Sequence, residues 1–235
     1  MTTARDLMIT AMDVAPDPPA AGELSLALAG AELIDLLTAE AIRLDGDRIV
    51  PGHRPAIADR LLDQAAESLA REAPYETVAD WLWRRGLGLA PAYLSALETD
   101  GQLTRRRRGL LPFRTGRTAL VDSPDRRLAG DRWASKEPVL VALATAVGIR
   151  DGETDEAPDT AAPDTGTPDN EAPDTAASGT AAPDTAAPDT EAPDTADDAV
   201  ETVLVAVNEA LLELEAVRQR RSIEQDAFDN VWRGY

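Results

Sequence analysis

The chain has 235 residues, a formal net charge of -20 and no cysteine. This length suits one domain or two small ones, and the 43% of hydrophobic residues can supply a core. The absence of cysteine excludes disulfides and thiolate metal sites. We expect no signal peptide, because acidic residues interrupt the apolar N-terminal stretch. No apolar run approaches the ~18 residues that cross a bilayer.

The negative charge is concentrated in one segment. Residues 151–200 contain 15 acidic residues and no basic one. The rest of the chain contains the other 28 acidic residues and all 23 Lys and Arg, so its net charge is only weakly negative. The rest of the chain can therefore still bind an anionic partner.

A proline repeat marks the clearest boundary in the chain. The unit Ala-Pro-Asp-Thr recurs between residues 157 and 195, mostly with proline at every fifth position. Proline prevents a helix from propagating, and this segment has no large apolar side chain to bury. We therefore predict that residues 151–198 form a disordered acidic insertion. It separates a helical domain, residues 1–150, from a C-terminal helical segment, residues 199–235.

Helical periodicity dominates the chain before the insertion. Residues 24–41 are apolar on nearly every face, with only Glu32, Asp35 and Glu40 charged, which predicts a central core helix. Apolar spacing predicts further helices at residues 4–14, 57–71, 77–85, 91–98, 124–133 and 137–149. The predicted fold class is therefore mainly α.

Two small β-hairpins are also predicted. In residues 42–50, an Asp-Gly pair lies between alternating apolar residues, which is a strong hairpin signal. In residues 102–121, apolar and β-branched ends enclose two glycines and a proline. Gly101 precedes this second hairpin and is expected to cap the helix before it.

Apolar residues recur at helical spacing again after the insertion. They are Val200, Val203, Leu204, Val207, Leu211, Leu214 and Val217. This pattern is one face of a helix of about five turns. Such a helix cannot form a core alone, so we expect it to pack back on the N-terminal domain. A helix that self-associates is the alternative.

The sequence offers little catalytic chemistry. His53 is the only histidine, in a Pro-Gly-His-Arg-Pro turn, and no Ser/His/Asp grouping or metal-ligand spacing can be singled out. Residues 86–91, GLGLAP, lack the lysine and the spacing of a P-loop. We therefore expect no enzymatic activity, no bound metal and no cofactor.

The second hairpin combines arginines with an apolar tip. The tip is Leu110, Leu111, Pro112 and Phe113, and the flanking arginines are Arg105, Arg106, Arg107, Arg108, Arg114 and Arg117. Arginine binds phosphate through paired hydrogen bonds. Each large apolar side chain gains roughly 1.5–3 kcal/mol when fully buried. This combination predicts contact with an anionic membrane surface.

Other interpretations of this hairpin stay open. It could be the wing of a winged-helix nucleic-acid binder, although the apolar tip and the lack of basic residues in the preceding helix argue against DNA. It could also be an ordinary hairpin whose apolar residues pack on the domain and whose arginines pair with local acids. A non-catalytic interaction scaffold, with a protein partner or a second copy, is a further alternative.

The succession of stretches along residues 4–150 is itself informative. LALAGAELIDLL is followed by LLDQAAESLA, ETVADWL and ALETDGQL, which leads into RRRRGLLPFRTGR. This order resembles the bacterial branch of the Golgi phosphoprotein 3 family. The resemblance implies a mainly α-helical single-domain fold and binding of phosphatidylinositol 4-phosphate, with the hairpin tip inserted into the bilayer. It further implies a cytoplasmic protein on the inner face of the membrane.

The resemblance also bears on the headgroup pocket. The family has one tryptophan and three arginines in its headgroup pocket. The positions of this chain that match them are Ala20, Ala29, Leu87 and Ala90. We therefore expect weaker or broader binding of anionic lipids. Arg84 and Arg85 are nearby basic groups that could substitute. Trp81 and Trp83 lie beside them at alternate positions, so the two cannot both face the core of one helix.

Overall fold

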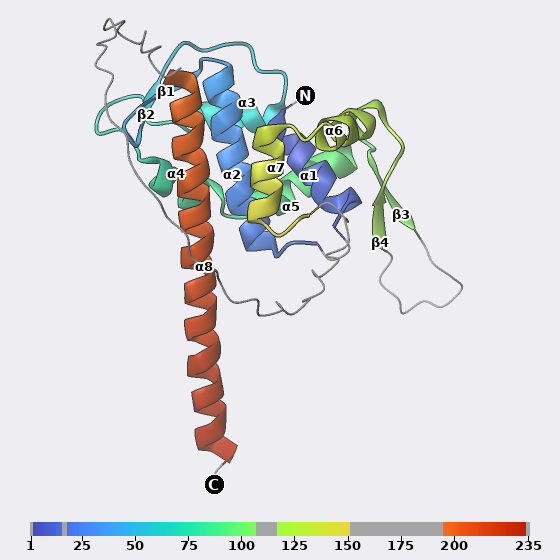
Figure 1. Cartoon of the computed structure of the whole chain (residues 1–235), viewed down its shortest axis with the longest axis vertical. Coiled ribbons are helices and arrows are strands. Elements are labelled where there is room, and N and C mark those ends of the chain that lie inside the picture. The colour runs from blue at the N-terminus through green and yellow to red at the C-terminus, as the bar shows by residue number, and fades with distance from the viewer. Residues whose placement is uncertain (1, 16–17, 107–116, 151–194, 234–235) are drawn as a thin grey trace, which may run out of the picture. The chain divides into compact units, whose positions relative to one another are not determined.

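The structure is a computed structural model that describes residues 2–15, 18–106, 117–150 and 195–233. Within these ranges, the side chains of residues 105, 106, 117, 118, 195, 226, 227 and 229–233 are not described. The described chain forms eight α-helices and two antiparallel hairpins (Figure 1). The predicted fold class, mainly α with two small hairpins, is confirmed. Residues 151–194 of the predicted disordered insertion lie outside the described residues.

The elements follow one another in the predicted order. The helices before residue 151 are α1 (Thr3–Asp13), α2 (Ala21–Thr38), α3 (Arg60–Glu67), α4 (Val78–Arg85), α5 (Leu89–Thr99), α6 (Pro124–Ala134) and α7 (Pro138–Ala146). The strands are β1 (Ile42–Asp45), β2 (Arg48–Pro51), β3 (Leu103–Arg106) and β4 (Arg117–Leu120). The last helix, α8 (Thr195–Arg233), has 39 residues and is much longer than the five turns expected.

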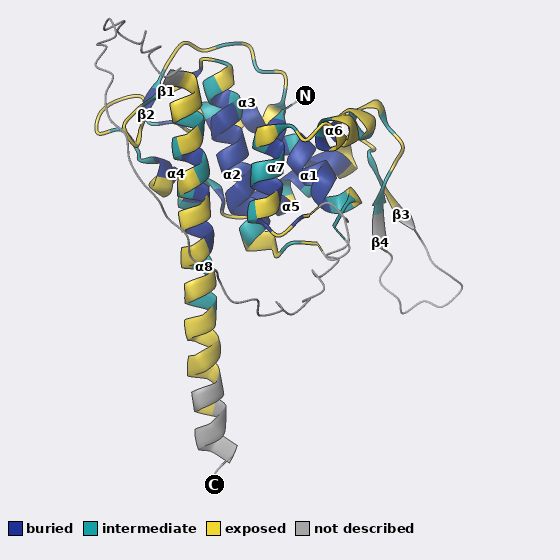
Figure 2. Ribbon diagram, in the orientation of Figure 1, coloured by how far each residue is buried: buried dark blue, intermediate teal, exposed yellow. Residues whose placement is uncertain are grey.

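Helix α2 lies at the centre of the domain, as predicted. It is buried without a break from residue 24 to residue 34, and it contacts α1, α3, α4, α5, α7 and α8 (Figure 2). It ends at Thr38, earlier than expected. Glu40 there adopts a left-handed conformation with φ of 52°, and its N–H donates to the carbonyl of Leu37. This geometry closes the helix and turns the chain into β1.

Side-chain caps explain where several helices begin. Asp59 accepts hydrogen bonds from the backbone N–H groups of Leu61 and Leu62, so α3 starts at Arg60 rather than at residue 57. Thr77 caps α4 in the same way through the N–H of Asp80. Thr2 and Ser123 cap α1 and α6 through similar hydrogen bonds. The apolar pattern alone does not identify these capping residues.

The first hairpin also positions α4. Its two-residue turn is Gly46-Asp47, and Gly46 has a φ of 61°. The N–H of Ile49 donates to the carbonyl of Glu76, and the N–H of Val78 donates to the carbonyl of Asp47. The segment that leads into α4 is therefore hydrogen-bonded to the edge of this hairpin.

Helix α8 packs against α2, α4 and α7 through its first half. Val203, Val207, Ala210 and Leu211 are buried there. The two helices approach closely at Gly30, where an added Cβ would lie 2.3 Å from Cγ2 of Val207. From residue 219 onward, every α8 side chain that the structure describes is exposed (Figure 2).

Candidate functional site

The arginine hairpin, residues 103–120, is tied to the domain at its base. β3 and β4 pair in antiparallel register, with Leu103 opposite Leu120. Both leucines are partly buried and pack against the core. Below them, the N–H of Val121 donates to the carbonyl of Gln102 at 2.8 Å, and the Gln102 amide donates to Asp125. The direction in which the hairpin leaves the domain is therefore fixed by the core.

Gly101 sets the turn into this hairpin. Its φ is 69°, and its N–H donates to the carbonyl of Glu98. The N–H of Gln102 donates to the carbonyl of Leu97. This pair of bonds is a Schellman motif, and the prediction of a glycine cap at this helix end is confirmed.

The distal part of the hairpin lies outside the described side chains. These residues include the predicted arginines Arg105, Arg106, Arg107, Arg108, Arg114 and Arg117, and the predicted tip Leu110, Leu111, Pro112 and Phe113. The backbone places Arg106 opposite Arg117 at the last described pair of the two strands. The ten residues 107–116 connect these two positions.

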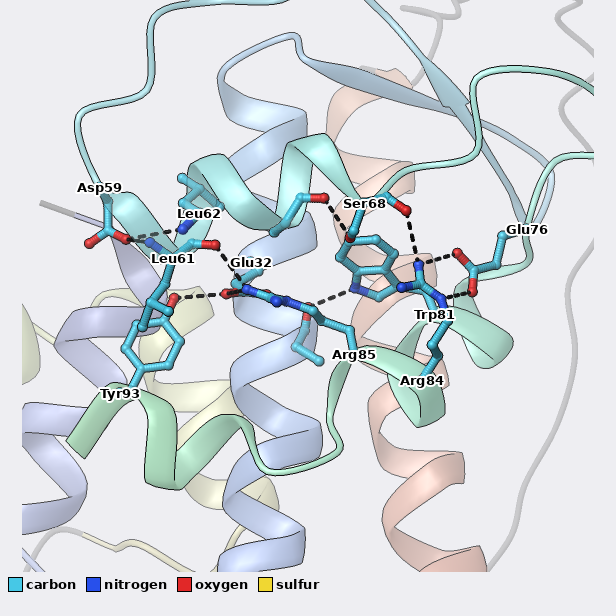
Figure 3. A network of polar contacts seen from close by, with 12 residues as sticks. Glu32, Asp59, Leu61, Leu62, Ser68, Glu76, Trp81, Arg84, Arg85 and Tyr93 are labelled. Atoms are coloured by element: carbon cyan, nitrogen blue, oxygen red, sulfur yellow. Dashed lines mark hydrogen bonds and ion pairs between the residues drawn. The ribbon is translucent and has the colours of Figure 1, made fainter. Parts of the chain in front are cut away.

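Of the predicted headgroup arginines, the side chains of Arg84 and Arg85 are described, and both have carboxylate partners. Arg84 donates to both oxygens of Glu76 at 2.7 Å, and its Cζ lies 5.0 Å from the centroid of the Trp81 ring (Figure 3). The hydrogen bond to Glu76 raises the pKa of Arg84, against the opposing effect of burial. A phosphate at Arg84 would have to compete with this two-point contact.

Arg85 is held more deeply. It donates to the two oxygens of Glu32 at 2.7 and 2.8 Å and to the carbonyl of Leu61 at 2.9 Å. Glu32 is fully buried in α2, and the hydroxyl of Tyr93 donates to the same carboxylate at 3.1 Å (Figure 3). Burial raises the pKa of Glu32, and burial followed by the negative charge of Glu32 raises that of Tyr93 well above its ordinary value.

This network of hydrogen bonds connects α2, α4 and α5 with the first turn of α3. Removing one partner of a buried ion pair leaves an uncompensated charge, at a cost of roughly 3–5 kcal/mol. A lipid phosphate would incur that cost if it drew Arg85 away from Glu32. The geometry thus assigns Arg85 to the interior of the domain. The sequence carries a signal for this network, because Glu32 lies in the middle of an apolar helix. A carboxylate is almost never fully buried without a partner, so a basic or hydroxyl group facing Glu32 could have been predicted.

The four positions matched to the family's pocket are not gathered into a charged site. Ala29 and Ala90 are buried in the core, whereas Ala20 and Leu87 are exposed, Leu87 by 83%. The carbonyl of Ala29 accepts a hydrogen bond from Nε1 of Trp81 at 3.4 Å. Of the two tryptophans, Trp81 is fully buried and Trp83 is half-buried, as their alternate positions require.

Groups suited to catalysis or metal binding do not come together in the part of the chain that the structure describes. His53 is exposed after β2. No cluster of three or more His, Asp or Glu side chains within the described ranges could hold a metal ion. None of the described helices is long and apolar enough to cross a membrane.

The chain was compared with models of protein families. The model of one protein family, Golgi phosphoprotein 3 (GPP34), matches residues 4–163. The matched range runs from the second residue of α1 past the end of α7, so it includes both hairpins and more than half of the chain. A comparison with curated proteins gave no match.

Proposed function

The chain belongs to the Golgi phosphoprotein 3 family, and we propose that it is a non-catalytic peripheral protein that binds anionic phospholipid membranes through the arginine hairpin. By family resemblance, the favoured headgroup is similar to phosphatidylinositol 4-phosphate. The membrane is the inner, cytoplasmic face, where anionic lipids attract basic segments.

The antiparallel pairing of β3 with β4 carries this proposal. It holds both ends of residues 107–116 at one place on the domain. Residues 103–120 contain six arginines and no acidic residue, in a chain with a net charge of -20. Near an anionic bilayer, each arginine contributes on the order of 1 kcal/mol. The hairpin is thus a concentrated positive segment on a rigid base.

The apolar tip adds a contribution that salt does not screen. Arginine contacts with phosphate weaken as salt rises. Burial of the Leu110, Leu111 and Phe113 side chains in the acyl region does not depend on charge. Lipid binding should therefore fall with salt to a residual level, whereas binding to DNA should continue to fall steeply.

Arg84 and Arg85 are left out of the proposed lipid contact. Their guanidinium groups already bind Glu76 and Glu32. Ala29 and Ala90, at two pocket positions, are core residues without charge. For these reasons we propose that the hairpin recognises anionic lipids broadly and prefers phosphatidylinositol 4-phosphate only weakly.

Co-sedimentation with vesicles tests the proposal. Neutral, generally anionic, and phosphatidylinositol 4-phosphate-containing vesicles are compared, with the wild type and the double variant Leu111→Asp, Phe113→Asp. The wild type should bind both anionic kinds, and the tip variant should lose most of that binding.

The matched control is the double variant Leu128→Asp, Val205→Asp. It makes the same change in charge at apolar side chains that are 52% and 50% exposed and lie outside the hairpin. This control should retain most of the binding. Equal loss in both variants would mean that added charge alone weakens binding, and no binding by the wild type would refute the proposal.

A further inference from the structure

The arginine hairpin joins the domain between two aspartates. Asp100 is the C-cap residue of α5, just before β3 begins at Leu103. Asp125 lies in the first turn of α6, shortly after β4 ends at Leu120. The two carboxylates therefore lie at the entry and the exit of the hairpin.

One guanidinium group faces both of these carboxylates. Arg5, in the first turn of α1, donates from Nη2 to Asp100, and its Nε lies 3.8 Å from Oδ2 of Asp125. Its Nη1 lies 3.7 Å from Oδ2 of Asp59, the N-cap of α3. The side chain of Arg5 is only 17% exposed, so salt screens these contacts weakly. Arg5 thus connects α1 with α3, α5 and α6.

These partners keep Arg5 charged. Burial acts to lower its pKa, but the hydrogen bond and charge of Asp100, together with the charges of Asp59 and Asp125, raise the pKa above its ordinary value. A planar guanidinium can face several carboxylates in a fixed geometry, whereas a lysine ammonium is a point charge on a flexible stem. Arginine is therefore the residue type that suits a joint between separate elements.

Further contacts hold the base of the hairpin against α1. The Gln102 amide donates to Asp125, the carboxylate that Nε of Arg5 faces. Arg126 donates two hydrogen bonds, at 3.0 and 2.5 Å, to Asp13, the last residue of α1. Both β4 and α6 contact α1 (Figure 1). Helix α1 is thus the support on which the exit of the hairpin is held.

We propose that Arg5 is a positioning residue for the membrane contact, because it holds both ends of the hairpin and so sets the angle at which the hairpin leaves the domain. This role rests on the proposed function of the hairpin. The apolar tip and the arginines reach one flat bilayer together only in a limited range of directions. A hairpin that moves freely at its base loses that freedom when it binds, and the loss weakens its affinity.

The signs of the charges separate this role from simple electrostatics. Asp100 and Asp125 are negative and lie beside a segment that is proposed to bind anionic phosphate. If charge alone mattered, removing either carboxylate would strengthen binding to an anionic membrane. If the two carboxylates position the hairpin through Arg5, removing either one should weaken binding.

A distance measurement between two spin labels tests the positioning directly. The chain has no cysteine, so Thr104→Cys in β3 and Ala79→Cys in α4 introduce two labels at exposed positions. In the full chain without lipid, pulsed electron paramagnetic resonance should give one narrow distance distribution. Arg5→Gln should broaden it at least about twofold, since a base with fewer contacts opens locally. Arg54→Gln is the matched control, because it removes an arginine that pairs with Glu67 away from the hairpin.

Vesicle co-sedimentation tests the consequence for binding. Asp100→Asn keeps the size of a side chain that is 46% exposed, so this variant should fold. Like Arg5→Gln, it should broaden the distance distribution and lower the affinity for anionic vesicles about three- to tenfold. Asp45→Asn removes the same charge at an exposed carboxylate in the first hairpin and should bind at least as tightly as the wild type. Circular dichroism confirms that each variant keeps its helical content.

The two measurements separate this inference from the proposed function. If the wild type binds no vesicle, the proposed function fails, but a broadened distribution in Arg5→Gln would still support the positioning of the hairpin by Arg5. Distributions of equal width in the wild type, Arg5→Gln and Asp100→Asn would overturn the inference. An Asp100→Asn variant that binds anionic vesicles more tightly than the wild type would overturn it as well.

Discussion

At the scale of single residues, two helix ends carry a conformation that side chains usually avoid. Among the residues that the structure describes, four close helices in the left-handed region, and two of them are the glycines Gly101 and Gly148. The other two are Glu40, with φ of 52°, and Lys136, with φ of 56°. A side chain costs roughly 1–2 kcal/mol in this region relative to the right-handed one, because Cβ approaches the following carbonyl.

Replacing Glu40 by glycine should therefore stabilise the protein. We expect Glu40→Gly to raise the free energy of unfolding by about 0.5–1 kcal/mol, since the gain is partly offset by the greater entropy of an unfolded glycine. Urea denaturation measures this change. Glu40→Ala is the control, because it removes the carboxylate and keeps Cβ. If the alanine variant gains as much as the glycine variant, the backbone conformation is not the cause.

Asp35 links two helices and should make stability depend on pH. Its carboxylate in α2 accepts hydrogen bonds from the N–H groups of Thr3 at 2.8 Å and Ala4 at 3.1 Å, at the start of α1. Burial raises the pKa of Asp35, and these backbone hydrogen bonds oppose the shift. The folded protein thus binds a proton at a pH where the unfolded chain has already released it.

The sign of the effect follows from linkage. A raised carboxyl pKa contributes stability that is fully present below the unfolded pKa and is lost as the pH rises through the folded one. The stability of the wild type relative to Asp35→Asn should therefore increase as the pH is lowered from neutral through that window. Urea titrations at several pH values measure the difference, with Asp47→Asn as the control at an exposed carboxylate. A difference that shrinks as the pH falls would contradict the prediction.

Single residues also show what the sequence could and could not predict. Gly101 was identifiable as a cap because glycine is the usual residue there. Glu40 and Lys136 were not, because nothing in their chemistry favours a left-handed conformation. The carboxylate partners of Arg84 and Arg85 were likewise missed, since Glu76 and Glu32 meet them only through tertiary contacts between separate elements.

At the scale of elements, the contact of α2 with α8 depends on the absence of one side chain. Alanine is normally favoured over glycine inside a helix by about 1 kcal/mol. At Gly30, however, the added Cβ would lie 2.3 Å from Cγ2 of Val207, which is fully buried. Valine is stiff about χ1 and cannot rotate away easily. This glycine therefore allows the two helices to approach each other closely at this point.

Gly30→Ala should destabilise the protein despite the better helix propensity. Overpacking of a core contact costs typically about 1–3 kcal/mol, which exceeds the gain in propensity. In a Val207→Ala background, the same substitution should become neutral or stabilising. A double-mutant cycle by urea denaturation measures this coupling. Gly30→Ala with the same effect in both backgrounds would show that Val207 is not the obstacle.

The types and order of the elements were predictable, but their ends were less so. Apolar periodicity located every helix before residue 151, because each of them buries one face or more in the same core. The start of α3 depends on Asp59, whose role as a cap becomes clear only when the chain direction is known. The length of α8 was underestimated, since its later residues interrupt the apolar stripe with Arg221 and Glu224.

At the scale of the whole molecule, opposite charges are segregated along the chain. Residues 151–200 hold 15 acidic residues, and residues 103–120 hold six arginines without an acidic one. Charges that are not in contact still interact within about one Debye length, ~8 Å at physiological salt. The acidic segment should therefore oppose binding of the chain to any anionic surface.

Neutralising the acidic segment should strengthen lipid binding. A variant with Asp→Asn and Glu→Gln throughout residues 151–194 keeps the length and the prolines. At low salt it should bind anionic vesicles more tightly than the wild type, and the difference should shrink as salt is added. Vesicle co-sedimentation across a salt series measures both trends. Identical binding curves would show that the acidic segment does not influence the membrane contact.

The central claim is that the arginine hairpin binds the phosphates of an anionic membrane. The most direct measurement is the fraction of full-length protein that co-sediments with anionic vesicles when Arg105, Arg106, Arg107, Arg108, Arg114 and Arg117 are all replaced by glutamine. With each arginine contributing on the order of 1 kcal/mol, the affinity should fall by at least about tenfold. Binding that equals that of the wild type would contradict the claim and direct attention to another surface.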